Sequence, residues 1–361
     1  AADDLRFELR RGDDDGARHG FVVLADPQPS REAHLAEFEA TTVPAVARAA
    51  GTLPGEVFGV GLGDLVGDAP QLLPGYAAAV ARTGLPFFHL LGNHDGSPGD
   101  RKGPFHRRFG PARYSFDRGE IRYVVMDNVS WFCGRYRGRL GRAQLDWLRA
   151  DLAGVERGRT VVVFAHIPLL GTYHLRHGKG VGRWHSTADR DALCALLEPF
   201  RAHFVAGHMH EHEHGSVGGV REHVVGTVCG NFWDGPVNLD GTPRGFGLFE
   251  ARGGEVRWRY APTDGSGPVR LTAPGVAPEA PAAAVANVWD WDEDWSLAWF
   301  ADGVARGAPR RFRGVAPAWR ARFGAAGPAP GSVGDHRTGT LFALDGLAGD
   351  QRAHLEATRS S

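Results

Sequence analysis

The fold is decided by the stretch His89-Leu90-Leu91-Gly92-Asn93-His94-Asp95-Gly96, which follows the apolar residues Pro86-Phe87-Phe88. An apolar run of strand length that ends at Gly-Asn-His-Asp places an amide, an imidazole and a carboxylate at the edge of a sheet, where they can meet a ligand. Gly, Asn and Asp also favour ordinary turns for local backbone reasons. Whether this stretch is an ordinary turn or a binding site depends on the residues that follow the other predicted strands.

The same pattern, an apolar run that ends in polar residues, recurs along the first 210 residues. Strands are predicted at 20–25, 57–62, 121–127, 160–165 and 203–206, and helices near 30–51, 70–83, 141–154 and 189–200. Alternating strands and helices indicate an α/β sheet with crossovers, whose ligands gather beyond the strand ends. Further strands near 222–229, 245–250 and 255–260 close this part of the chain.

The length of 361 residues suits one large and one small domain. We predict a catalytic domain over 1–264, a linker rich in Pro, Gly and Ala over 265–284, and a small β-rich domain over 285–361. The tryptophans of the last part are expected to be core and hairpin residues.

Composition excludes several classes of protein. The net charge of −1 gives no sign of nucleic-acid binding or of a polybasic membrane patch. Three cysteines without CxxC spacing indicate neither a disulfide framework nor a thiolate zinc site. No run reaches the roughly 18 apolar residues of a membrane span. We therefore expect a soluble protein. The first residue is Ala1, which fits an exported protein with a processed signal, with a cytoplasmic chain as the alternative.

Polar side chains that follow these apolar runs should meet at one sheet edge. They combine carboxylate, amide and imidazole donors without a thiolate, which is the ligand set of a binuclear site for divalent metals. The set is Asp26, Gln28, Asp64, Asn93, His94, Asp95, His166, His208 and His210.

These motifs resemble the calcineurin-like metallophosphoesterase family, whose pattern is D-x-H, G-D-x-x-D, G-N-H-D/E, a lone H and G-H-x-H. The counterparts here read DPQ (26–28), GDLVGD (63–68), GNHD (92–95), His166 and GHMH (207–210), within residues 18–260. The resemblance implies an α/β fold in which two mixed β-sheets pack face to face and are flanked by helices. A looser resemblance of the last segment implies the small all-β C-terminal domain of a bacterial subgroup.

The resemblance also implies roles for the metal ligands. Asp64 would bridge two divalent ions; Asp26, Gln28 and His210 would complete the first site, and Asn93, His166 and His208 the second. A metal-bridging hydroxide would attack phosphorus. Gln28 stands where the commoner pattern has His, and its harder oxygen donor favours Mn, Fe or Mg over Zn.

The GNHD motif would also supply the proton transfer. His94 would assist the leaving group, and Asp95 would hold the His94 imidazole in the correct tautomer.

Substrate contacts are expected from two places. The first is the Gly-rich segment between Leu169 and Asp189, with His174, Arg176, His177, Lys179, Arg183 and His185; a solvated basic loop is the alternative. The second is Asn231 and Trp233, for which a structural turn is equally expected. His212 and His214 are expected to face the rim or solvent, and the acidic stretch 290–294 to form a solvated turn.

The predicted function is metal-dependent hydrolysis of a small-molecule or polymer-linked phosphoester, leaning to a phosphomonoesterase because of the cationic segment. A phosphodiesterase or a diphosphate hydrolase on the same metal site is the alternative. A noncatalytic metal-binding scaffold is the alternative of another class, and His94 argues against it, since a scaffold needs no acid. The identity of the phosphoester and the oligomeric state stay open.

Overall fold

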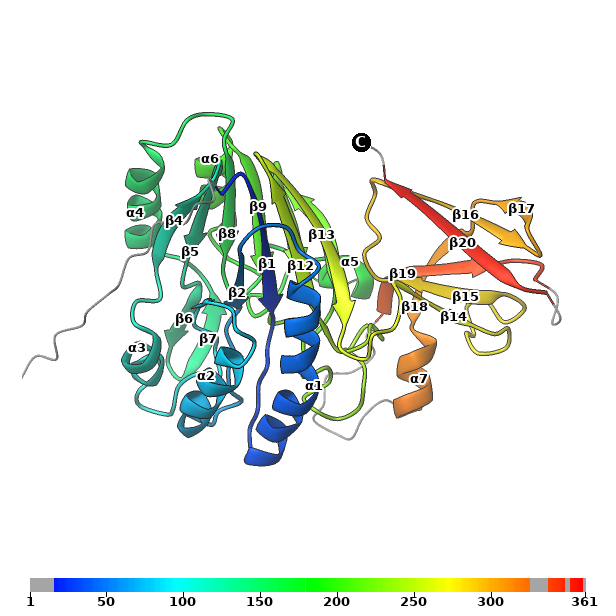
Figure 1. Cartoon of the computed structure of the whole chain (residues 1–361), viewed down its shortest axis with the longest axis horizontal. Helices are drawn as coiled ribbons and strands as arrows, with labels where there is room; N and C mark the ends of the chain where they lie inside the picture. Colours follow the sequence, from blue (N-terminus) through cyan, green and yellow to red (C-terminus); the bar gives the residue numbers. More distant parts are fainter. Residues whose placement is uncertain (1–15, 179, 325–336, 348–350, 360–361) are drawn as a thin grey trace, which may run out of the picture.

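The computed structural model describes residues 16–178, 180–324, 337–347 and 351–359. The larger part consists of two β-sheets packed face to face, with helices covering the outer face of each (Figure 1). The smaller C-terminal part contains two further sheets beside it. This confirms the predicted α/β/β/α sandwich followed by a β-rich segment.

The first sheet has the strand order β13-β12-β1-β2-β3, and its adjacent strands β1, β2 and β3 run parallel. Helices α1 and α2 pack on its outer face, with Phe38 and Tyr76 buried against Leu24. The strands are β1 (Arg18–Leu24), β2 (Val57–Gly61), β3 (Phe87–His89), β12 (Gly245–Arg252) and β13 (Glu255–Pro262), and the helices are α1 (Glu32–Ala50), η1 (Pro70–Leu72) and α2 (Leu73–Ala81).

The second sheet has the order β10-β11-β9-β8-β5-β4, with β5, β8, β9 and β11 parallel. Helices α4 and α6 cover its outer face, where Leu148 and Leu193 are fully buried. The elements are β4 (Tyr114–Arg118), β5 (Ile121–Val125), β8 (Thr160–Phe164), β9 (Arg201–Ala206), β10 (Glu213–Val217), β11 (Val220–Val224), α4 (Arg142–Leu152) and α6 (Arg190–Leu197).

The core between the two sheets is aromatic. Phe21 of β1 stacks on Phe249 of β12 with ring centroids 4.7 Å apart, and meets Tyr123 of β5 and Phe164 of β8 edge-on. All four are buried, so this layer fixes how the sheets face each other. Because the parallel strands of both sheets end on the same side, the polar residues that follow them are brought together.

Three smaller elements lie near these strand ends: α3 (Gly103–Phe109), a hairpin of β6 (Val129–Phe132) and β7 (Arg135–Gly138), and α5 (Tyr173–His177). The segment expected to be a long loop between Leu169 and Asp189 therefore contains a short helix. None of the helices in the described ranges is long and apolar enough to cross a lipid bilayer.

The C-terminal part has one sheet of order β14-β15-β19-β18 and one of order β17-β16-β20. The expected linker over 265–284 contributes strand β14, because residues 269–272 pair antiparallel with β15. Trp289, Trp299 and Trp319 are buried, as expected for core residues. The elements are β14 (Val269–Thr272), β15 (Ala284–Val288), β16 (Trp295–Ala301), β17 (Val304–Gly307), β18 (Arg310–Val315), α7 (Pro317–Phe323), β19 (Arg337–Leu344) and β20 (Ala353–Arg359).

Candidate metal centre

The ends of five parallel strands deliver the predicted ligands. Asp26, Asp64 and Asn93 follow β1, β2 and β3 of the first sheet, while His166 and His208 follow β8 and β9 of the second. A hydrogen bond joins the ends of the two sheets, since the backbone N–H of His208 donates to Oδ2 of Asp26 at 2.8 Å. The two sheets thus form one polar site at a shared edge.

Several residues of this site have a positive φ, which is an uncommon backbone conformation. Ten residues other than glycine have a positive φ in the part of the chain that the structure describes, and six of them belong to the site: Asp26, Gln28, Asp64, Asp68, His208 and His210. This conformation costs on the order of 1 kcal/mol for each residue, and it persists where the surrounding structure imposes it. The strained backbone positions therefore coincide with the polar residues that form the site.

His166 shows why the centre requires a positive charge. Its Nδ1 donates to the carbonyl of Leu62 at 2.8 Å, so its Nε2 carries a lone pair. This Nε2 lies 3.3 Å from Oδ2 of Asp64 and 3.0 Å from Oδ1 of Asn93, both of which are acceptors. Burial lowers the pKa of His166, but the Asp64 carboxylate outweighs it and raises the pKa to about 9, so near neutral pH a proton occupies this lone pair when no cation is bound. A bound cation would satisfy all three atoms at once.

The other two histidines are oriented in the same way. The Nε2 of His208 donates to the carbonyl of Trp184 at 2.8 Å, and the Nδ1 of His210 donates to the carbonyl of Gly230 at 2.7 Å. Their remaining nitrogens therefore present lone pairs to the centre, with Nδ1 of His208 3.2 Å from Nε2 of His166. A carbonyl on the far nitrogen is the usual support of a metal-bound imidazole.

The carboxylates and the amide complete the donor set. Burial raises the pKa of Asp26 to about 7, and its Oδ1 has no hydrogen-bond partner among the described residues, although Nε2 of His210 lies 3.7 Å away. Burial also raises the pKa of Asp64, but His166 and His94 outweigh it and hold that pKa well below its usual range. A buried carboxylate oxygen without a partner is costly. These residues fit divalent cations, which take oxygen and imidazole donors.

Gln28 lies at the same centre with its amide nitrogen toward Asp64, at 3.2 Å from Oδ2. Its Oε1 lies 3.7 Å from Sγ of Cys229. A metal ligand requires the oxygen, and a half-turn of the amide exchanges the two atoms. In the conformation shown, Gln28 supports Asp64 by hydrogen bonding and does not present its oxygen to the centre.

The partner of His94 differs from the predicted one. The Nδ1 of His94 lies 2.8 Å from Oδ2 of Asp68, whereas Asp95 accepts the backbone N–H groups of Gly92 at 2.7 Å and Val66 at 3.1 Å. The prediction that Asp95 holds the imidazole is therefore wrong. The tight turn directs Asp95 inward, where it is fully buried and ties the loops after β2 and β3 together.

Asp68 is a candidate site residue to which the sequence motifs gave no role. It is the last residue of the motif GDLVGD, four residues after Asp64, and this position was the signal for a carboxylate partner of His94 other than Asp95. Burial lowers the pKa of His94, but Asp64 and Asp68 outweigh it and raise the pKa to about 9. The imidazole is thus held in its charged form by two carboxylates, while its side chain stays 32% exposed.

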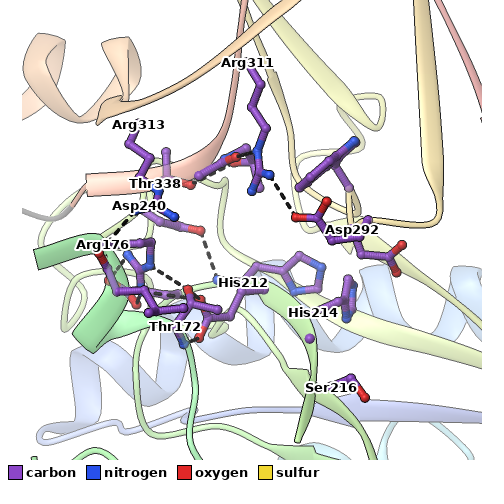
Figure 2. A pocket seen from close by; sticks show the side chains of 18 residues that line it. Thr172, Arg176, His212, His214, Ser216, Asp240, Asp292, Arg311, Arg313 and Thr338 are labelled. Atoms are coloured by element: carbon purple, nitrogen blue, oxygen red, sulfur yellow. Dashed lines mark hydrogen bonds and ion pairs between the residues drawn. The ribbon is translucent and has the colours of Figure 1, made fainter. Parts of the chain in front are cut away.

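Most of the segment 169–189 does not face the centre. Arg176 donates to Oγ1 of Thr172 at 2.8 Å (Figure 2). It is also buried against Glu211 and reaches the backbone carbonyl of Arg337. The ring of His185 packs on Tyr173, and His174 lines a separate cavity. Lys179 and the side chain of His177 lie outside the described residues. Of the predicted set, Arg183 lines a cavity beside the metal centre.

Asn231 and Trp233 lie in the loop between β11 and β12 and are buried. The indole Nε1 of Trp233 donates to the carbonyl of Pro27 at 2.9 Å, and the ring stacks on His34. Trp233 therefore supports the loop that carries Asp26 and Gln28, rather than presenting a free surface to substrate.

A second cluster with metal-like spacing lies between the two parts of the chain. His212 and His214 are buried, contrary to the expected exposure, and their Nε2 atoms lie 3.1 and 3.4 Å from Oδ1 of Asp290. The N–H of Gly226 donates to Nδ1 of His212 at 3.2 Å, so the Nε2 of His212 carries a hydrogen toward Asp290. This tautomer favours a hydrogen-bonded network over a metal site.

Comparison with known proteins agrees with this geometry. Residues 21–212 match the family model described as calcineurin-like phosphoesterase, and residues 222–327 match the model described as the C terminal of calcineurin-like phosphoesterase. The first match covers more than half of the chain. The protein therefore belongs to the calcineurin-like phosphoesterase family, which confirms the resemblance seen in its motifs. No curated protein matches the sequence.

Several solved structures are similar. GAP50 of Plasmodium, described as the anchor in the inner membrane complex, is 13% identical, with a TM-score of 0.48 over 69% of this chain and 86% of that chain. A putative 5′-nucleotidase from Staphylococcus aureus is 13% identical, with a TM-score of 0.45 over 68% of this chain and 54% of that chain. The phosphopantetheinyl hydrolase PptH from Mycobacterium tuberculosis is 12% identical, with a TM-score of 0.36 over 59% and 91%.

Proposed function

We propose that this protein is a metal-dependent phosphoester hydrolase with two divalent ions at the strand ends. The observation that carries the proposal is the convergence on Nε2 of His166, a buried position where two acceptor oxygens and the ring nitrogen together require a proton or a metal ion between them. Asp64 would hold both ions, with Asp26, Gln28 and His210 on one side and Asn93, His166 and His208 on the other. Such ions supply a nucleophilic water and neutralise phosphoryl charge.

His94 is the group of this chain that would act on the leaving oxygen. Its backbone N–H donates to Oδ1 of Asp64 at 2.8 Å, which places the residue directly beside the proposed bridging carboxylate. Its imidazole is partly exposed and held charged by Asp68, so it can donate a proton to the departing oxygen. A scaffold without catalysis has no use for this arrangement.

The walls of the site favour a monoester over a diester. Arg135, Arg137 and Arg183 line a cavity next to the metal centre, and their positive charge favours the more negatively charged substrate, which is a monoester rather than a diester. A diester carries less charge and would gain less from these three side chains.

The test is a panel of p-nitrophenyl phosphate and bis-p-nitrophenyl phosphate assayed with Mn²⁺, Mg²⁺, Fe²⁺ and Zn²⁺. We expect hydrolysis of the monoester to exceed that of the diester, and Mn²⁺, Fe²⁺ or Mg²⁺ to support more activity than Zn²⁺. Asp64→Asn and His94→Ala should each reduce the rate by at least a hundredfold. Absence of turnover of either ester with every metal would overturn the proposal.

A further inference from the structure

A cavity of about 450 Å³ lies beside the metal centre, between the β6–β7 hairpin and the segment at 183–184. Its volume falls within the roughly 300–1,000 Å³ of small-molecule sites. The walls are aromatic and cationic, and they include Phe132, Arg135, Tyr136, Arg137, Arg183 and Trp184. The metal ligands themselves do not line it.

Tyr136 and Trp184 join this cavity to the metal centre. The ring of Tyr136 meets the ring of His208 edge-on with centroids 5.7 Å apart, and the carbonyl of Trp184 accepts the hydrogen bond of His208. The cavity therefore adjoins the proposed metal ligand His208 through both an aromatic contact and a hydrogen bond.

A cavity that adjoins the centre through His208 can hold the part of the substrate that is not the transferred phosphoryl group. In a phosphomonoester or a diphosphate this part is the leaving group, whose oxygen His94 is proposed to protonate.

The arginines of the cavity have no carboxylate partner among the described residues. Arg135 and Arg183 are exposed, and the buried Nε of Arg137 has no hydrogen-bond partner in the described part of the chain. The arginines deeper in the fold differ, since Arg176 pairs with Glu211 and Arg122 pairs with Asp151. Three unpaired cations at one cavity indicate an anionic ligand.

The aromatic residues add a second requirement. The rings of Tyr136 and Trp184 meet with centroids 5.4 Å apart, and the side chain of Phe132 is 73% exposed at the tip of the hairpin. An exposed phenylalanine beside a cavity offers a flat apolar surface to a planar ring.

We propose that this cavity binds the leaving group of the substrate, and that the leaving group carries both a planar ring and a further anionic group, as in a nucleoside diphosphate. The proposal rests on the proposed hydrolysis and names its substrate class. A water oxygen bonds to the terminal phosphorus, the bond from that phosphorus to the bridging oxygen breaks, and the products are inorganic phosphate and the nucleoside monophosphate. No further reactant is needed.

The experiment compares kcat/KM for three substrates of the Mn²⁺-loaded full chain. ADP offers a ring and a second phosphate, p-nitrophenyl phosphate offers only a ring, and pyrophosphate offers only a second phosphate. We expect ADP to exceed each of the others at least tenfold. The Arg135→Ala/Arg183→Ala variant should reduce the ratio of ADP to p-nitrophenyl phosphate at least tenfold, because charge-assisted contacts are lost.

Two further variants complete the design. Phe132→Ala should lower the ratio of ADP to pyrophosphate severalfold, because the surface for the ring is removed. Arg142→Ala is the matched control, since Arg142 is an exposed arginine of α4 paired with Asp146, and it should leave all ratios unchanged. All four positions are at the surface, and circular dichroism checks that each variant is folded.

The outcomes separate the two proposals. Two results would overturn the proposal that this cavity binds the leaving group: hydrolysis of p-nitrophenyl phosphate without a preference for ADP, or a preference for ADP that persists in the Arg135→Ala/Arg183→Ala variant. Neither result would contradict the proposal that the protein is a hydrolase. A protein that hydrolyses none of the three substrates with metal bound would overturn the hydrolase proposal itself.

Discussion

Replacing Asp68 with asparagine tests the assignment of the His94 partner. The change removes one negative charge and preserves the shape of the side chain. Burial and the carboxylates of Asp64 and Asp68 together set the pKa of His94 at about 9. Without the Asp68 charge, the imidazole loses part of the support for its protonated form, and the 2.8 Å contact that orients it is weakened.

The size of the effect follows from this contact. A hydrogen bond to a charged group contributes about 1.5–3 kcal/mol. The Asp68 side chain is 65% exposed, and solvent screening places the contribution at the lower end, about 1–2 kcal/mol. We therefore expect kcat to fall about five- to thirtyfold. KM should change little, because Asp68 acts through His94.

The assay is hydrolysis of p-nitrophenyl phosphate by the metal-loaded protein from pH 5 to 10. Since an acid must be protonated, the rate declines above the pKa of His94, and loss of Asp68 should move this alkaline limb to lower pH. In a His94→Asn background, Asp68→Asn should have almost no additional effect. Asp95→Asn is the matched control, and it should lower thermal stability because Asp95 binds two backbone N–H groups.

Two results would refute the assignment. One is a kcat and pH profile of Asp68→Asn equal to those of the unchanged protein. The other is a shift of the alkaline limb in folded Asp95→Asn but not in Asp68→Asn, which would restore Asp95 as the partner of His94.

Three further changes test the packing of the metal centre and of the contact between the two parts of the chain. Gly92→Ala would place a Cβ 2.0 Å from the backbone nitrogen of Asp64, so activity should be lost and the free energy of unfolding should fall by about 1–3 kcal/mol. Gly154→Ala is the control: its Cβ would lie in open space, so activity and stability should both stay unchanged. Arg176→Met removes the buried cation that pairs with Glu211 and should cost about 3–5 kcal/mol in urea unfolding; a cost below 1 kcal/mol would contradict the buried pair. Burial lowers the pKa of His214 to about 4, so its neutral form contributes stability above pH 6.5 that is lost as the pH falls to 4. The free energy of unfolding should fall between pH 7.5 and pH 4.5, and this fall should be about 3 kcal/mol smaller in His214→Gln than in the unchanged protein.

The sequence was sufficient to predict the layers of the fold and the place of the site. The run Gly20–Ala25 before Asp26, and Thr160–Ala165 before His166, end at the predicted sheet edge. Such runs are informative because a strand buried on both faces is apolar throughout, and the first polar residue after it marks its exit. The family predicted from the motifs at these strand ends is confirmed by the family model that matches residues 21–212.

Side-chain partners were harder to predict, because they depend on backbone turns that a linear pattern does not contain. Asp95 follows His94 directly, yet the turn points it at Gly92, and Asp68 reaches His94 from another loop. His212 and His214 were expected to face the rim or solvent, and their positions depend on where β10 begins, at Glu213. His212 and His214 became buried because the C-terminal part supplies Asp290, a contact between distant segments.

The most direct test of the account is the number of metal ions bound per chain. Purified protein loaded with Mn²⁺ and dialysed should retain two equivalents by elemental mass spectrometry, and Asp64→Asn should retain fewer than one, because Asp64 is the carboxylate proposed to hold both ions. Two equivalents in folded Asp64→Asn, or none in the unchanged protein at saturating Mn²⁺, would contradict the proposed metal centre.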